Sequence, residues 1–422
     1  MILKMGRRLA ESIISKIRSC KKSPNLRVEG HEKAFTRDRK LTAERIVSMI
    51  IEPAKQSLQK RLFDFGVRFM NGEFATKQAF SKQRKFVDPE FIREFYDENA
   101  EDLLDNGGLK TFKGMHLTAV DGMRVACENT PELIAEFGCS GSNKDACTAL
   151  ASVAYDVIER VSFDCQIGSY SLSERELMDR HLNRLEDFGA ENFLIVADRG
   201  YPSYDLMETL VDRGFNFLLR LSDAWKNVIS QMGDSSDCVF KYECNDQVYS
   251  FRILKIDLGD KYEYLVTNLG RDVLSFDEAK HIYSLRWNVE TFFGFVKTEL
   301  ELENFSGKTK NAVLQEFYAT LTIANVCLCF VNDADREIAA SQENKNHVHA
   351  HQANRRQCVG QIVPKFLECV FTDSKRKRNR LWKEVEQFCA RFSEPIRPGR
   401  SPVRKQPRDR KFYPNARKPG LS

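Results

Sequence analysis

Three widely separated carboxylates are the residues of this sequence best suited to chemistry. Asp121 stands in Ala-Val-Asp-Gly, Asp198 in Ala-Asp-Arg-Gly, and Glu290 in the segment 283–297. Each aspartate follows an apolar run and precedes a glycine, where an aspartate alone is more often a turn residue. Three carboxylates held together repel one another unless a cation neutralises them. Mg²⁺ or Mn²⁺ binds such oxygens, and two ions about 4 Å apart could activate a water or 3′-hydroxyl and stabilise the leaving oxygen of a phosphodiester.

The segment 283–297, YSLRWNVETFFGFVK, predicts an amphipathic helix. Successive residues of a helix are rotated by about 100° around its axis, so four polar side chains fall on one stripe roughly 60° wide. They are Tyr283, Arg286, Glu290 and Lys297. One interpretation is an ordinary helix in which Arg286 and Glu290 form an i,i+4 ion pair. An ion pair gives no reason for Lys297 to share the stripe, whereas a bound phosphate strand does.

The charge distribution favours a polyanion-binding enzyme with an acidic centre. Residues 375–422 hold sixteen Lys or Arg against four Asp or Glu, and residues 1–90 hold twenty-one against ten. The stretch 91–374 therefore carries a net charge of −18 between flanks of +11 and +12. Basic flanks can hold phosphates while an acidic middle holds cations, although basic ends are also common as solvated tails.

Residues 1–106 have the apolar periodicity of helices and predict a helical N-terminal domain. Within it, the segment 71–86 has a turn signal and Thr76 as a candidate N-cap. The helix that follows would expose basic side chains, among them Lys77, Lys82, Arg84 and Lys85. This suits a helix-turn-helix-like element that contacts DNA, and a short basic helix on a bundle surface suits the pattern equally well.

From Gly114 onward, β-branched and aromatic runs predict strands and, with two helices, an α/β domain that has a mixed sheet. The predicted strands are 115–120, 146–157, 160–167, 192–197 and 215–221, and the predicted helices are 173–188 and 204–213. This arrangement assigns 107–214 to the first part of the core. Three further strands in 215–272 predict an inserted β subdomain.

The second part of the core is 273–335, which includes the 283–297 helix and a long apolar helix from Ala312 to about Val331. The apolar run 321–331 is too short to span a bilayer and fits a buried core helix. Residues 336–422 predict a helical region and a basic tail that contains Arg397 and Arg400. The twelve cysteines form no CxxC pair, which favours reduced thiols in a cytoplasmic protein.

The sequence resembles bacterial DDE transposases of the insertion-sequence-four family. The resemblance rests on the two aspartate motifs and on the YREK signature, Tyr-x2-Arg-x3-Glu-x6-Lys, which Tyr283, Arg286, Glu290 and Lys297 meet in full. The β insertion between the second aspartate and the glutamate also matches that family. FTRDRKL at 35–41 and RPGRS at 397–401 extend the likeness over most of the chain.

The resemblance implies a ribonuclease-H-like catalytic core with an inserted β subdomain, between a helical N-terminal domain and a helical, basic C-terminal region. It implies that Asp121, Asp198 and Glu290 are catalytic ligands of two Mg²⁺ or Mn²⁺ ions. It further implies that Tyr283, Arg286 and Lys297 bind DNA phosphates. Trp287 lies beside the polar stripe of the predicted helix, where its indole could stack on an unpaired base. In some relatives cleavage passes through a DNA hairpin with a flipped base, which Trp225 in the insertion could assist. Packing is an equally good explanation for Trp287.

The activity implied is cut-and-paste transposition by a cytoplasmic, non-membrane protein that binds terminal inverted repeats and target DNA, as a homodimer in the DNA complex. Two alternatives stay open at this point. One is a metal-dependent nuclease of the same fold without strand transfer. The other is a catalytically inactive DNA-binding relative, against which the presence of all three carboxylates argues.

Overall fold

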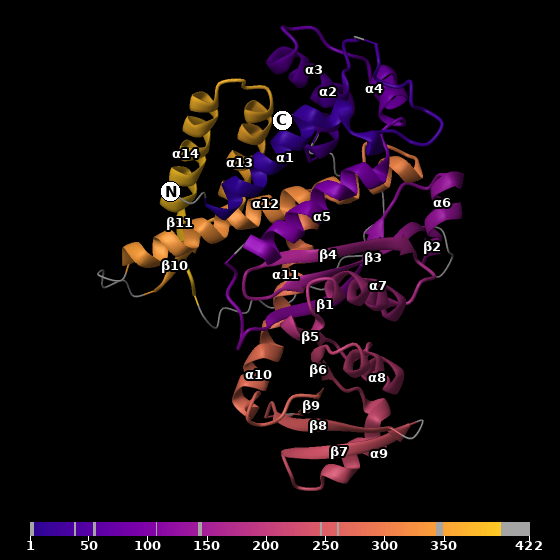
Figure 1. The fold of residues 1–422 in the computed structure, drawn as a ribbon, viewed down its shortest axis with the longest axis vertical. Helices are drawn as coiled ribbons and strands as arrows, with labels where there is room; N and C mark the ends of the chain where they lie inside the picture. Colours follow the sequence, from indigo (N-terminus) through magenta and orange to yellow (C-terminus); the bar gives the residue numbers. More distant parts are fainter. Residues whose placement is uncertain are drawn as a thin grey trace. The chain divides into compact units, whose positions relative to one another are not determined.

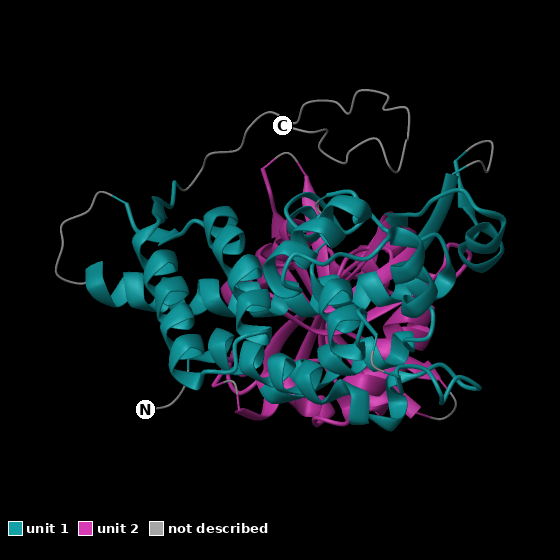
Figure 2. Ribbon diagram, turned by 90° about the horizontal axis from the view of Figure 1, so that it is seen from above, with its two compact units in different colours: residues 1–102, 125–149, 294–422 teal, residues 103–124, 150–293 magenta. Residues whose placement is uncertain are grey.

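The computed structural model describes residues 4–397 except 38, 54–55, 107, 142–145, 245–246, 260 and 343–348. These residues form two compact units (Figure 2). The helical unit comprises 1–102, 125–149 and 294–422, and the sheet unit comprises 103–124 and 150–293. The chain passes between the units within α5 (Pro89–Asn106), β1 (His116–Ala126), β3 (Ala146–Asp156) and α11 (Trp287–Thr298). The domain boundaries predicted from the sequence stay predictions.

The core of the sheet follows the order β4-β3-β1-β5-β6 (Figure 1). Its strands are β1 (His116–Ala126), β3 (Ala146–Asp156), β4 (Val161–Ser169), β5 (Phe193–Ala197) and β6 (Asn216–Arg220). β5 lies parallel to both β1 and β6, and β2 (Cys139–Ser140) pairs antiparallel with β3. Helix α7 (Glu174–Glu186) connects β4 to β5, and α8 (Tyr204–Asp212) connects β5 to β6. This mixed α/β arrangement is the predicted ribonuclease-H-like core.

The strands of the predicted β insertion extend this sheet. They are β7 (Asp237–Cys244), β8 (Gln247–Asp257) and β9 (Tyr262–Thr267). β9 pairs antiparallel with β6, β8 with β9, and β7 with β8. The physical reason is that β6 would otherwise be an edge strand with a row of unpaired backbone N–H and C=O groups. The insertion supplies those partners.

The helical unit is organised around α12 (Lys310–Gln342), against which α1 (Met5–Ser19), α2 (Ala43–Ile51), α13 (Arg355–Val370) and α14 (Lys375–Arg391) pack (Figure 1). Further α-helices that lie in it wholly or in part are α3 (Leu58–Phe69), α4 (Lys77–Arg84), α5 (Pro89–Asn106), α6 (Pro131–Phe137) and α11 (Trp287–Thr298). In the same unit, β10 (His351–Ala353) pairs with β11 (Ser393–Pro395). By length and composition α12 could cross a membrane, but 94% of its most apolar stretch is buried inside the structure. The prediction of a buried core helix is therefore confirmed.

Candidate active site

The register of two parallel strands places Asp121 and Asp198 at corresponding positions. Ala119 on β1 pairs with Val196 on β5, and each aspartate stands two residues further along its own strand direction. Asp198 directly follows β5, whereas Asp121 lies inside β1, which runs on to Ala126. This corrects the prediction of a turn at Asp121-Gly122. The strand continues past the Asp-Gly pair because Val125 and Ala126 are themselves buried, so the gain from burial outweighs the local turn preference.

A buried polar chain lies beneath Asp121. The Ser152 hydroxyl donates to the Asp121 carbonyl oxygen at 3.0 Å, His181 Nε2 lies 2.9 Å from Ser152 Oγ, and His181 Nδ1 lies 2.6 Å from Asp164 Oδ2. All three of these side chains are inaccessible to solvent. Serine, histidine and aspartate are the residue types of a hydrolytic triad, but here the Ser152 hydroxyl donates its proton to a backbone carbonyl. The chain therefore holds β1, β3, β4 and α7 together around Asp121 rather than presenting a nucleophile.

Glu290 is carried by α11 (Trp287–Thr298), which follows α10 (Phe276–Leu285) after a break at Arg286. At this break, the Arg286 N–H bonds the Tyr283 carbonyl at 3.1 Å and the Val289 N–H bonds the Arg286 carbonyl at 3.0 Å. Both bonds span three residues instead of four, which tightens the chain. The single continuous helix expected over 283–297 is thus corrected to two helices that meet at Arg286.

The guanidinium of Arg286 is the cation of the site. Its Nη1 lies 3.6 Å from Asp121 Oδ2, and its Nη2 donates to Glu290 Oε1 at 3.2 Å. The Tyr283 hydroxyl donates to Asp198 Oδ1 at 3.2 Å. Arg286 is only 2% exposed, and its charge also acts on Asp198. The structure therefore brings Asp121, Asp198, Glu290, Tyr283 and Arg286 together in the sheet unit.

The two aspartates titrate differently because their surroundings differ. Burial raises the pKa of Asp121 to about 6, although the charge of Arg286 opposes this rise. Burial also acts to raise the pKa of Asp198, but the backbone N–H of Arg199 and the charges of Arg286 and Arg220 hold it below its usual value. Asp198 is thus the more readily ionised of the two, and Asp121 has the greater need of a cation.

Arg220 is a member of this site that the sequence analysis missed. It ends β6, and its side chain lies 3.5 Å from Asp198 Oδ1 and 3.1 Å from Glu263 Oε1. The signal available in the sequence was a charge at the end of the buried run Phe-Leu-Leu, the same signal that singled out the two aspartates. Arg220 places a second cation beside Asp198.

The part of the chain that carries this geometry is similar to known proteins. The profile of the family described as "Transposase DDE domain" matches residues 113–326. This range spans half of the chain and contains all three carboxylates.

The chain belongs to the transposase DDE domain family.

A curated relative from Geobacillus stearothermophilus, "Probable transposase for insertion sequence element IS5377", is 25% identical over 156 residues. The match covers 34% of this chain and 41% of that relative. Among solved structures, the chain is similar to the one described as "Cryo-EM structure of piggyBac transposase synaptic complex with hairpin DNA", with 9% identity and a TM-score of 0.46. That match covers 90% of this chain and 82% of the other.

The predicted ligands Asp121, Asp198 and Glu290 are chemically suited to a hard divalent cation, since Mg²⁺ and Mn²⁺ prefer carboxylate oxygens. Asp121 is largely buried among other acidic groups, a situation that a cation relieves. Within the described part of the chain, no three carboxylate, histidine or cysteine side chains are already gathered as a metal site. Arg286 instead holds Asp121 and Glu290. The residues therefore fit such an ion chemically, with Arg286 as the present counter-charge.

The other predicted ligands of DNA around α11 have partners within the protein. Lys297, which belongs to the helical unit, lies 3.0 Å from Glu303 Oε1, and Glu303 also accepts from the Ala126 N–H at 3.1 Å. The Arg286 guanidinium lies 4.9 Å from the ring centroid of Trp287, whose surface is 50% exposed. Trp225 packs on Tyr204, and the centroids of these two rings are 4.7 Å apart. The DNA roles predicted for Lys297, Trp287 and Trp225 stay predictions.

In the helical unit, α4 begins as predicted: the Thr76 side chain accepts from the Ala79 N–H at 3.2 Å. Lys77, Lys82 and Lys85 on and beside this helix are exposed. Arg397 is also exposed, and Arg400 lies outside the described residues.

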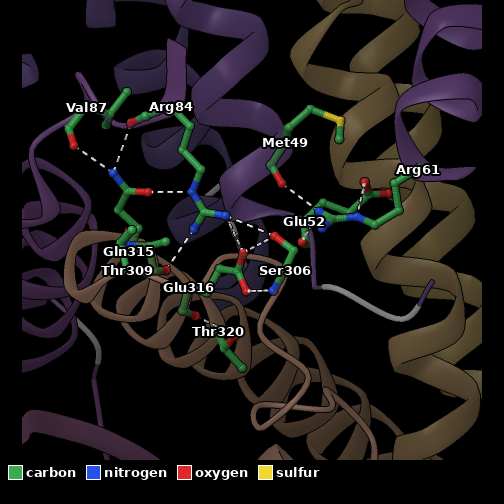
Figure 3. Close-up of polar contacts among 11 residues, drawn as sticks. Met49, Glu52, Arg61, Arg84, Val87, Ser306, Thr309, Gln315, Glu316 and Thr320 are labelled. Atoms are coloured by element: carbon green, nitrogen blue, oxygen red, sulfur yellow. Dashed lines mark hydrogen bonds and ion pairs between the residues drawn. The ribbon is translucent and has the colours of Figure 1, made fainter. Parts of the chain in front are cut away.

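Arg84 departs from its predicted place among the DNA contacts, because its side chain is 4% exposed and fully engaged inside the helical unit (Figure 3). It donates to Gln315 Oε1 at 2.7 Å, to Ser306 Oγ at 2.9 Å, to Glu316 Oε1 at 2.5 Å and to the Ala312 carbonyl at 2.8 Å. The physical reason is the buried Glu316, whose charge needs a partner in a low-dielectric environment. Arg84 is therefore a structural residue that joins α4 to the start of α12.

Proposed function

We propose that this member of the DDE family is a cut-and-paste transposase. It binds the terminal inverted repeats of an insertion sequence, cleaves DNA strands in the presence of Mg²⁺ or Mn²⁺, and transfers the freed ends to target DNA. The observation that carries the proposal is the convergence of Asp121, Asp198 and Glu290 on one buried guanidinium, inside the residues that match the DDE domain. Nothing in a packed sheet requires three carboxylates around one buried guanidinium.

Asp121, Asp198 and Glu290 are the residues that would hold the metal ions. When bound, two such ions supply the activation of a water or 3′-hydroxyl and the stabilisation of the leaving oxygen. Tyr283 orients Asp198 through its hydroxyl, and Arg286 and Arg220 offer positive charge on which a phosphate of the cleaved strand can bind. Lys297 extends the phosphate contacts along α11, and Trp287 or Trp225 stacks on an unpaired base.

The remaining contacts with double-stranded DNA come from the basic flanks. Lys77, Lys82 and Lys85 present positive charge from α4, and Arg397 and Arg400 do so near the end of the chain. These contacts to phosphates give affinity that depends on salt. The protein acts in the bacterial cytoplasm, associates with the nucleoid through DNA, and pairs two transposon ends as a homodimer.

Strand transfer separates this function from simple hydrolysis by a nuclease of the same fold. The test is incubation of the purified full chain with Mg²⁺, a labelled DNA carrying the element's own terminal repeat, and a supercoiled target plasmid. A transposase joins the labelled end to the plasmid and yields a slower-migrating covalent product. Release of the label without joining, under conditions that permit cleavage, would contradict the proposal and leave a nuclease.

A second DNA with scrambled terminal repeats is the control for end recognition. The proposal expects joining to depend on the intact repeat, because inverted-repeat binding precedes cleavage. The Asp272→Asn variant serves as the protein control, since Asp272 is exposed on the surface of the sheet unit. It should join ends as the wild type does.

A further inference from the structure

Glu174 is a carboxylate near the candidate active site that has no assigned role. It is the first residue of α7, where a capping box fixes the backbone. The Ser173 side chain accepts from the Glu176 N–H at 3.2 Å, and the Glu176 carboxylate accepts from the Ser173 N–H at 2.7 Å. Because Ser173 and Glu176 cap the helix, the Glu174 side chain is not needed as a cap, and its backbone is held at a defined position.

The Glu174 carboxylate lies against the backbone beside both catalytic aspartates. A Cβ atom placed on Gly122, the residue after Asp121, would stand 2.6 Å from Glu174 Oε1. A Cβ atom on Gly200, two residues after Asp198, would stand 3.8 Å from Glu174 Oε2. Gly122 therefore leaves the space that the carboxylate fills, because a side chain at this position would displace the carboxylate from its present place.

Glu174 lacks the compensation that a half-buried carboxylate normally has. It makes no hydrogen bond and no ion pair with the residues that the structure describes, whereas Arg286 pairs with Asp121 and Glu290. The charges that act on Glu174 are those of Asp198, which repels it, and of Arg124, which attracts it. Like charges kept this close are a place where a cation is bound favourably.

Tyr201 gives an independent sign that the cluster is built for a polar ligand. Its side chain is 1% exposed, and its hydroxyl has no hydrogen-bond partner among the described residues. The charges of Glu174 and Asp121 both act on the buried Tyr201 phenol. Ser152 is the hydroxyl that acts on the phenol as a polar neighbour, but the two oxygens do not meet the geometry of a hydrogen bond. An unpartnered buried donor beside two carboxylates is suited to a bound water or an ion's hydration shell.

We propose that Glu174 is a fourth carboxylate of the active site and supplies an oxygen ligand, directly or through a water, to a divalent cation held by Asp121 and Asp198. This inference rests on the proposed function, since it concerns the same metal site. It also gives the Asp-Gly motif a physical role: the glycine admits the Glu174 carboxylate.

The test is metal binding by the full-length protein, without DNA. Mn²⁺ is titrated by calorimetry and by the decrease of its free electron-paramagnetic-resonance signal, with wild type, Glu174→Gln and Glu191→Gln. Glu191 is an exposed glutamate of the same unit. We expect Glu174→Gln to raise the Kd for Mn²⁺ by about 10-fold or more, as loss of a ligand or of a residue that orients one does. Glu191→Gln should bind Mn²⁺ as the wild type does.

Glu174→Asp is a second variant, which keeps the negative charge at the start of α7 and shortens its reach. It should bind Mn²⁺ more weakly than wild type and more tightly than Glu174→Gln. If wild type and Glu174→Gln bind Mn²⁺ with equal affinity and stoichiometry, the inference is overturned while the proposed function stands. If the wild type binds no Mn²⁺, both the inference and the metal-dependent function are overturned.

Discussion

At the scale of single residues, the candidate site is a balance between carboxylates and one buried cation. Arg286 lies against Asp121 and Glu290 and acts on Asp198. This arrangement contains the i,i+4 ion pair that the sequence offered as its simpler interpretation, and it adds Asp121 to that pair. The guanidinium keeps acidic groups together that would otherwise repel one another. A bound divalent ion and Arg286 therefore satisfy the same charges.

The Arg286→Gln variant should show this exchange. Without the guanidinium, the carboxylates repel, and we expect the free energy of unfolding in EDTA to fall by about 1–3 kcal/mol. Mg²⁺ should restore more stability to the variant than it adds to the wild type, because the ion replaces the missing charge. Urea denaturation with and without Mg²⁺ measures both quantities.

Arg271→Gln is the matched control, because Arg271 is 63% exposed in its side chain and pairs with Asp237 at the surface. Its loss should change the free energy of unfolding little, because solvent screens an exposed ion pair, and the change should not depend on Mg²⁺. An equal loss of stability for Arg286→Gln in EDTA and in Mg²⁺ would show that the ion and the guanidinium do not share the carboxylates.

At the scale of elements, the parallel pair β1 and β5 sets the distance between the two aspartates, and α7 supports it from below. The chain from Asp164 through His181 and Ser152 to the Asp121 carbonyl connects three strands or helices to β1. Buried polar groups of this kind cost free energy when one partner is removed. The network therefore makes the position of Asp121 depend on β3, β4 and α7.

Ser152→Ala tests this dependence. The substitution leaves the Asp121 carbonyl and a His181 nitrogen without their bonds in a buried environment, so unfolding should become easier by about 1–3 kcal/mol. Ser171→Ala, at an exposed serine beside α7, should change the stability by less than about 0.5 kcal/mol. Equal stability of wild type and Ser152→Ala in urea would contradict the proposed support.

The second element with a testable role is α4, where exposed and buried cations lie on one helix. Arg84→Met removes the partner of the buried Glu316 and should destabilise the protein by about 3–5 kcal/mol. Lys82→Met should leave the stability unchanged and weaken binding to end DNA. Denaturation and DNA-binding titrations on both variants separate the roles, and a Lys82→Met variant with full affinity would remove α4 from the DNA-binding surface.

At the scale of the whole molecule, local signals predicted most elements and long-range contacts decided the rest. Buried strands such as β5 and the N-caps Thr76 and Ser173 could be read from the sequence, because each depends on neighbouring residues. The burial of Arg84 could not, because Glu316 is 232 residues away along the chain. The continuation of β1 through Asp121 depends on the burial of the strand's last residues in the folded protein. Arg220, in contrast, had a local signal, a charge at the end of a buried run.

The basic end of the chain makes a prediction about DNA binding by the full protein. Residues 398–422 contain eight Lys or Arg and one acidic residue. Deleting them should weaken binding to DNA and flatten the plot of log Kd against log salt concentration, since fewer counterions are released. An unchanged slope in fluorescence-anisotropy titrations would exclude this segment from the phosphate contacts.

The central claim is that Asp121, Asp198 and Glu290 act together in strand cleavage. The most direct measurement is single-turnover nicking of end DNA in Mg²⁺ by wild type, Asp121→Asn, Asp198→Asn and Glu290→Gln, with circular dichroism to establish that each is folded. Asp272→Asn is the control variant. We predict that each of the three carboxylate variants cleaves about 100-fold more slowly or not at all, while the control cleaves normally. If any one of the three carboxylate variants cleaved DNA at the wild-type rate, the central claim would be contradicted.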